Sequence, residues 1–253
     1  MDRLGDRRAG PAKIRCMASS PTRTPLLMLP GLLCDERLWR DQRDALADVA
    51  DTQVPDLTRD ADIGAMARRV LAAAPERFAL AALSMGGYVA FEILRQAPQR
   101  VSRLALLATS ASVDTPQRAA VRRASLAMAE SGRFAGVTRK LLPQLVHADH
   151  AEGEVGEVVM AMAQRVGREA FLRQQRAILE RPDSRAMLRS LDRPALIAVG
   201  EDDRMTQPEE SRRLHALIPH SQLHVFTRCG HLPPLEKPEE TSALLREWLL
   251  SPH

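Results

Sequence analysis

The sequence predicts an α/β fold, with a mostly parallel sheet of about six main strands flanked by helices and a helical insertion. Short apolar runs alternate with helical segments on both sides of a central stretch, a pattern typical of buried parallel strands joined by crossover helices. Between Thr109 and Leu191 this alternation stops and only helical periodicity remains. With 253 residues and 45% hydrophobic content, the chain can form one sizeable core that carries such an insertion.

The expected strands are runs of apolar residues, most of them bounded by polar or turn-forming positions. They cover Leu26–Leu29, Thr52–Val54, Phe78–Leu83, Leu104–Thr109, Ala195–Val199 and Gln222–Phe226. The expected helices have apolar residues three or four positions apart. In the core they cover Arg37–Ala47, Ile63–Ala74, Met85–Gln96, Pro208–Leu217 and Glu239–Leu249. In the insertion they cover Pro116–Glu130, Phe134–Leu142, Gly153–Val166 and Arg168–Leu179. We therefore expect a core formed by residues 25–110 and 191–253, with a helical cap over 111–190.

Residues 1–24 are polar, charged and without periodicity, so we expect a disordered basic extension. They carry six basic and two acidic groups, and the resulting charge of +4 equals that of the whole chain. The basic character therefore predicts no nucleic-acid-binding face. No apolar region follows the basic start, which argues against a secretory signal, and Met17 is an alternative natural start. No apolar run reaches about 18 residues, so we expect no membrane span. The three cysteines cannot all pair, and we therefore expect a protein of the reducing cytoplasm.

Ser84 is the strongest functional candidate. It lies in Ala82-Leu83-Ser84-Met85-Gly86, after an apolar run and before a helical segment. A serine on such a strand-to-helix turn, with small residues two positions before and after it, has the layout of a nucleophile elbow. Ala82 stands where glycine is usual and is the smallest residue that still has a Cβ.

An acid and a histidine follow Ser84 in the chain order expected of a hydrolytic triad. Asp203 comes shortly after an apolar run, and His231 precedes the last helix. Histidine can take the serine proton and return it to the leaving group, and a carboxylate fixes its tautomer. The neighbouring Asp202 and Glu201 are the other candidates for the acid.

The oxyanion that forms during acyl transfer needs backbone N–H donors. The Met85 amide follows the candidate nucleophile, and the Leu32 amide lies in the loop after the first predicted strand. We expect these two amides to form the oxyanion hole, with Gly31 and Leu33 beside the substrate.

Four motifs carry a resemblance to a known family. They are Met28–Asp35, Ala82–Gly87, Val199–Asp203 and Gly230–Glu236. At these residues the chain resembles the α/β-hydrolase superfamily, most of all small bacterial esterases and lactonases of the 3-oxoadipate enol-lactonase-like and carboxylesterase-like types. The resemblance implies that Asp203, three residues after Gly200, is the acid. It also implies a cap over Ser84, in which Met160 and Met162 either line the pocket or belong to an ordinary helix core.

We therefore predict a serine hydrolase, catalytic at Ser84, Asp203 and His231, that cleaves small to medium, rather apolar carboxylic esters or lactones. Such a hydrolase needs no cofactor. The sequence has no metal-binding spacing, so we expect no metal, and three cysteines that cannot all pair predict no disulfide framework. We expect a monomer or a homodimer. The alternatives are a carbon–carbon bond hydrolase, a thioesterase or a perhydrolase with the same triad, a cofactor-free oxygenase, and a non-catalytic small-molecule binder.

Overall fold

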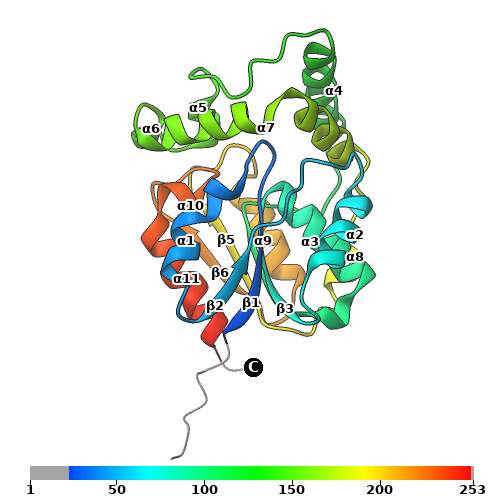
Figure 1. Ribbon diagram of the computed structural model, residues 1–253, viewed down its shortest axis with the longest axis vertical. Coiled ribbons are helices and arrows are strands. Elements are labelled where there is room, and N and C mark those ends of the chain that lie inside the picture. The colour runs from blue at the N-terminus through cyan, green and yellow to red at the C-terminus, as the bar shows by residue number, and fades with distance from the viewer. Residues whose placement is uncertain (1–22, 252–253) are drawn as a thin grey trace, which may run out of the picture.

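A computed structural model describes residues 23–251. Its centre is a six-stranded, all-parallel sheet with the strand order β2-β1-β3-β4-β5-β6 (Figure 1). The strands are β1 (Thr24–Leu29), β2 (Ala50–Gln53), β3 (Phe78–Leu83), β4 (Val101–Leu107), β5 (Ala195–Gly200) and β6 (Gln222–Phe226). The predicted fold class and the predicted number of strands are confirmed.

Helices cover both faces of the sheet, so alternate side chains of each central strand enter two separate cores. The helical elements of this layer are η1 (Glu36–Trp39), α1 (Arg40–Ala45), α2 (Ile63–Ala73), α3 (Met85–Gln96), η2 (Pro98–Arg100), α9 (Pro208–Leu217), α10 (Pro233–Glu236) and α11 (Pro238–Leu250). One core joins η1 and α11 to residues such as Met28 and Ala81. The other joins α2, α3 and α9 to residues such as Leu29 and Leu80. Burial on both faces explains why these strands read as continuous apolar runs.

The insertion after β4 is helical and contains α4 (Pro116–Glu130), α5 (Leu142–Leu145), α6 (Ala148–Ala151), α7 (Glu154–Leu179) and α8 (Arg185–Leu188). In Figure 1, α4 to α7 form a layer above the sheet, which we call the cap. Helix α8 lies lower, beside the core helices, and its Leu188 is fully buried with residues of α2, α3 and α9. The segment predicted to be cap therefore contains one short helix that packs with the core.

The prediction of a helix over Phe134–Leu142 is wrong. The chain there forms turns, and α5 begins only at Leu142. Gly132 and Gly136 both have positive φ angles, 84° and 63°, which interrupt a right-handed helix. The expected break near residue 167 is present as a kink inside α7, where Gly167 has a φ of 75°.

Strand β1 begins at Thr24, a residue that we expected to belong to the disordered extension. Thr24 is ordered because the backbone of β1 pairs with that of β2 from this residue onward. The rest of the predicted N-terminal extension lies outside the described residues. Within residues 23–251, no helix combines the length and the apolar character that a membrane crossing requires.

A buried ionic network joins the two ends of the cap to each other. Asp114, just before α4, accepts hydrogen bonds from Arg122 at 2.8 Å and from Arg181 at 2.9 Å. Arg181 follows α7, is almost fully buried, and lies over the ring of Tyr88 at 4.2 Å from the ring centroid. Burial alone would raise the pKa of Asp114, but the two arginine hydrogen bonds outweigh it and lower this pKa from 3.8 to about 2. The network therefore stabilises the folded state when Asp114 is ionised.

We predict that Asp114→Asn destabilises the protein near neutral pH and has less effect in acid. The lowered pKa corresponds to about 2 kcal/mol of stability. This contribution is fully present above the unfolded pKa near 4 and is lost as the pH falls through about 2. Urea unfolding of the wild-type protein and of Asp114→Asn between pH 7 and pH 2 measures this contribution to the free energy of unfolding. A stability difference that does not shrink toward pH 2 would contradict the assigned role of the ionised carboxylate.

Candidate active site

Ser84 occupies the sharp turn between β3 and α3, with a φ of 52° and a ψ of −114°. Few non-glycine residues adopt this conformation, which costs roughly 1–3 kcal/mol. Neighbouring groups hold this conformation through hydrogen bonds to the amide and to the carbonyl of Ser84. The Ser84 amide donates to the Leu107 carbonyl at 3.0 Å, and the Thr109 hydroxyl donates to the Ser84 carbonyl at 2.8 Å. The strand-to-helix turn predicted from the sequence is therefore strained and anchored to the end of β4.

Two glycines allow the backbone of this turn to pack closely. A Cβ at Gly86 would lie 2.5 Å from the Leu29 carbonyl oxygen, and one at Gly87 would lie 2.3 Å from the Thr109 hydroxyl oxygen. Any larger residue at either position would push α3 away from the sheet. Ala82 is fully buried, so the structure accommodates its methyl group.

The structure brings together the three residues that the sequence suggested for a triad. His231 Nε2 lies 2.9 Å from Ser84 Oγ, and His231 Nδ1 lies 2.8 Å from Asp203 Oδ2. The other Asp203 oxygen accepts the amides of Met205 and Thr206, each at 2.8 Å. Because a carboxylate only accepts hydrogen bonds, this arrangement favours a proton on Nδ1 and leaves Nε2 to accept the serine proton.

The parallel sheet explains how residues so distant in sequence meet. The loop at Gly31, Ser84, Asp203 and His231 follow β1, β3, β5 and β6, respectively. In an all-parallel sheet the carboxyl ends of all strands lie along one edge, where α/β proteins place their sites. The alternative acids lie elsewhere: Glu201 and Asp202 are exposed, and an Asp202 carboxylate oxygen lies 3.8 Å from His147 Nε2.

The loop from Gly31 to Cys34 lies against Ser84. A Cβ at Gly31 would lie 3.5 Å from Ser84 Cβ. Leu33 has a positive φ of 58°, and its amide donates to Oε1 of the fully buried Gln174 on α7 at 3.1 Å. The backbone amides of Leu32 and Met85 donate no hydrogen bond to any group of the described residues. Both residues line the cavity above Ser84. Both amides are thus available to an oxyanion.

A buried carboxylate fixes the loop that carries His231. Glu236 in α10 accepts the amide of Gly230 at 2.9 Å and that of Leu232 at 3.0 Å, on either side of the histidine. It also accepts the amide of His147, in the cap, at 2.7 Å. The His231 amide itself donates to the Leu145 carbonyl of α5 at 2.9 Å. The cap is therefore bonded directly to the histidine loop.

A cavity of about 620 Å³ lies above Ser84, between the core and the cap. Gly31 and Leu33 line it, as do Phe171 and Val159 of α7. Met160 and Met162 are not among the lining residues, although the sequence suggested them as substrate contacts. Met162 is fully buried in the hydrophobic core, and Met160 packs against the same core. Helical periodicity identified the helix correctly but not which of its faces borders the cavity.

The cysteines that the structure describes are Cys34 and Cys229, and both are free and buried. Burial raises the pKa of Cys34 to about 12 and raises that of Cys229 as well, so neither is a reactive thiolate. The part of the chain that the structure describes contains no group of three or more potential metal ligands.

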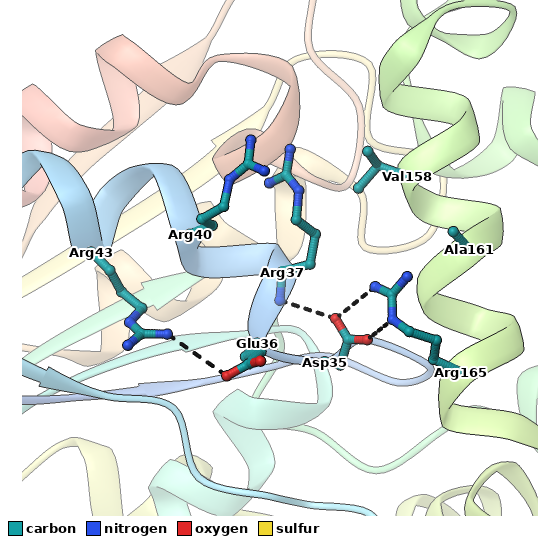
Figure 2. A pocket seen from close by; sticks show the side chains of 8 residues that line it. All are labelled: Asp35, Glu36, Arg37, Arg40, Arg43, Val158, Ala161 and Arg165. Atoms are coloured by element: carbon teal, nitrogen blue, oxygen red, sulfur yellow. Dashed lines mark hydrogen bonds and ion pairs between the residues drawn. The ribbon is translucent and has the colours of Figure 1, made fainter.

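A second hollow, of about 420 Å³, lies between η1, α1 and the cap helix α7 (Figure 2). Its lining is Asp35, Glu36, Arg37, Arg40, Arg43, Val158, Ala161 and Arg165. Arg165 forms a two-point bond with Asp35, at 2.7 and 3.2 Å, and Arg43 lies 3.8 Å from Glu36. Arg37 and Arg40 both lie near Asp41, at 3.3 and 3.2 Å. All four arginines of this hollow thus have a carboxylate partner.

Sequence reasoning missed three residues that hold the site in place: Thr109, Gln174 and Glu236. Glu236 was part of a recognised motif. Its position a few residues after Gly230 and His231 was the sequence signal that could have indicated its contact with this loop. Gln174 is a polar residue at a buried helix position, which becomes recognisable only when the buried face of α7 is known. The bond from Thr109 to Ser84 links two different strand ends, and the local sequence does not indicate it.

Comparisons with known proteins agree with this arrangement. Residues 58–238 match the family model described as alpha/beta hydrolase fold. The chain is 30% identical over 179 residues to a pimeloyl-[acyl-carrier protein] methyl ester esterase of Neisseria meningitidis, a match that covers 66% of this chain and 67% of the relative. A thermophilic esterase from Thermogutta terrifontis, solved with malate bound, is 31% identical with a TM-score of 0.80, covering 91% and 90% of the two chains. The enol-lactonase of Burkholderia xenovorans LB400 shares the fold, at 22% identity and a TM-score of 0.77 over 91% and 93%.

We predict that Glu236→Gln loosens the histidine loop. An amide side chain keeps one accepting oxygen but turns an N–H toward backbone N–H groups, and a buried donor without a partner costs about 1–3 kcal/mol. Urea unfolding measures the loss, and hydrogen exchange should become faster at Gly230 and Leu232. Glu239→Gln, an exposed change in α11, is the matched control. Equal exchange in the two variants would show that Glu236 does not fix the loop.

Proposed function

The chain belongs to the α/β-hydrolase fold family and is a carboxylic ester hydrolase, and we propose that it cleaves small to medium, rather apolar esters through an acyl-Ser84 intermediate. The observation that carries the proposal is the continuous chain of hydrogen bonds from Asp203 through His231 to Ser84, at 2.8 and 2.9 Å. Such a chain activates a hydroxyl that is a poor nucleophile on its own.

In the first half of the proposed reaction, Ser84 Oγ attacks the ester carbonyl carbon while His231 Nε2 takes the hydroxyl proton. The Leu32 and Met85 amides stabilise the negative charge on the carbonyl oxygen, each contributing roughly 3–4 kcal/mol in the transition state. His231 then donates the proton to the alkoxide, so that an alcohol leaves and the acyl group stays on Ser84. Asp203 stabilises the imidazolium that forms between these steps.

Water completes the cycle. His231 takes a proton from the water as its oxygen attacks the acyl-serine carbonyl, and then returns that proton to Ser84 Oγ as the ester bond breaks. The net reaction consumes one ester and one water and releases one acid and one alcohol. The cap covers Ser84 and limits the access of bulk water to the intermediate.

The cavity supports the proposed substrate class. Its volume of about 620 Å³ suits a small to medium molecule, and its walls include Leu33, Leu145, Val159 and Phe171. The relative from Neisseria meningitidis is named for the hydrolysis of a methyl ester, which supports an ester with a small alcohol over a lactone as the substrate.

We predict that the protein hydrolyses p-nitrophenyl esters in a series from acetate to decanoate, with a maximum at one chain length set by the cavity. Ser84→Ala should lower kcat/KM by at least about a thousandfold, because one member of a triad usually contributes that much. Thermal unfolding of the variant serves as the control for folding. A folded Ser84→Ala protein that keeps more than a few per cent of the activity would contradict the mechanism.

The same series separates the alternatives. If the wild-type protein hydrolyses no ester but reacts with a serine-directed phosphonate, the triad is active and serves another bond, such as a carbon–carbon or thioester bond. If neither reaction occurs in a folded protein, the cavity belongs to a non-catalytic binder.

A further inference from the structure

Gln175 of α7 is a buried polar residue in the wall of the cavity above Ser84. It lies between Phe171 and Ile178 along one side of the helix, and all three residues line the cavity. Residues three and four positions apart share one face of a helix, so this face of α7 borders the cavity. An amide side chain therefore stands between two apolar residues of the wall.

The orientation of the Gln175 amide is fixed by its neighbours. Arg122 of α4 donates to it at 2.6 Å. Because a guanidinium group can only donate, the atom of Gln175 that faces Arg122 is the carbonyl oxygen Oε1. Arg122 also donates to Asp114 at 2.8 Å, and Asp114 accepts a further hydrogen bond from Arg181 at 2.9 Å. The buried ionic network of the cap thus determines which way round the amide lies.

The amide nitrogen of Gln175 is left without a partner. Gln175 is only 5% exposed, and its Nε2 donates to no group of the described residues. This nitrogen is nevertheless open to solvent, unlike the indole nitrogens of Trp39 and Trp248, which are sealed in the core without a partner. Since Gln175 lines the cavity and is otherwise buried, its two N–H groups are accessible from the cavity.

Two hydroxyl groups of the cavity wall, those of Tyr88 and Thr206, also form no hydrogen bond within residues 23–251. A hydroxyl rotates and can either donate or accept, so these two groups do not discriminate between an acceptor and a donor on a ligand. The Gln175 nitrogen can only donate, and Arg122 fixes its position. Gln175 therefore selects for an acceptor more sharply than either hydroxyl.

From this arrangement we propose that Gln175 is a specificity-determining residue, whose N–H groups bind a second oxygen acceptor, a carbonyl or ether oxygen, in the acyl chain of the ester. This inference rests on the proposed esterase function and narrows its substrate class. The acyl chain is the part concerned, because a small alcohol leaves while the acyl chain stays on Ser84 and occupies the cavity. A chain with a methylene group at this point leaves a buried donor unpaired, which weakens its binding.

The test compares p-nitrophenyl esters of eight-carbon acids. The reference is the octanoate, and the others carry a keto group at carbon 4, 5, 6 or 7, which places the acceptor at different distances from the ester. Rates with Ser84→Ala are subtracted as background. Gln175→Glu keeps the side-chain length and the oxygen acceptor for Arg122 but removes both N–H groups. Gln175→Met removes the donor and the acceptor together.

We expect kcat/KM for one keto ester to exceed those of its isomers by about tenfold in the wild-type protein, since pairing a buried donor contributes roughly that much. Gln175→Glu and Gln175→Met should each reduce this positional preference to about twofold or less. The matched control is Gln144→Glu, the same change at an exposed position of α5 outside the cavity lining, which should keep the preference. Thermal unfolding verifies that each variant is folded.

The outcomes separate this inference from the esterase function. If the wild-type protein hydrolyses the octanoate through Ser84 but prefers no keto position, the acceptor site is wrong and the esterase stands. A preference that either folded Gln175 variant retains has the same meaning, because Gln175 then serves only to hold Arg122. If no ester is hydrolysed, calorimetric binding of the corresponding methyl esters decides: tighter binding of one keto isomer that Gln175→Glu abolishes supports the acceptor site, and equal binding overturns it.

Discussion

The strained backbone at Ser84 is the constraint on which the rest of the site depends. A φ of 52° at a serine is unfavourable by itself, and it persists because the surrounding packing leaves no alternative. The Leu107 carbonyl and the Thr109 hydroxyl hold the two sides of the peptide, and the close contact of Gly86 with Leu29 fixes the start of α3. Those contacts come from both strands that neighbour β3, so the serine points to the same place only while the sheet is intact.

The cap is part of this arrangement rather than a separate cover. It is bonded to the loop before η1 through Gln174 and Arg165, and to the histidine loop through Leu145 and Glu236. The two loops lie on opposite sides of Ser84 in the strand order, after β1 and β6. A shift of the cap would therefore move the loop that carries Leu32 and the loop that carries His231 together. The hydrogen bonds of the cap thus couple access to the cavity to the positions of these two loops.

Local patterns predicted most of the fold and the central residues of the site. The bounds of β3, α3, α4, α9 and β6 were predicted without error, because each has a clear apolar run or period and a start or stop signal nearby. Ser84, Asp203 and His231 were identified because each follows a strand in a recognisable motif. The residues that were missed act over long sequence distances: Gln174 bonds to Leu33, 141 residues away, and no local pattern encodes such a contact. Met160 and Met162 show the same limit, since a helical period does not say which face meets the cavity.

Arginines hold this fold in two ways. Some have a carboxylate partner, as Arg122 and Arg181 have Asp114, whereas the buried Arg103 donates to the Trp248 carbonyl and to Ser251. Arg118, Arg133 and Arg204 line the rim of the cavity above Ser84 and form no ion pair among the described residues, and Arg133 and Arg204 are exposed to water. Salt screens exposed charges at the rim far more strongly than buried hydrogen bonds. The buried pair of His231 and Asp203 is shielded from salt in this way, so we expect ionic strength to leave the hydrogen bonds around Ser84 nearly unchanged.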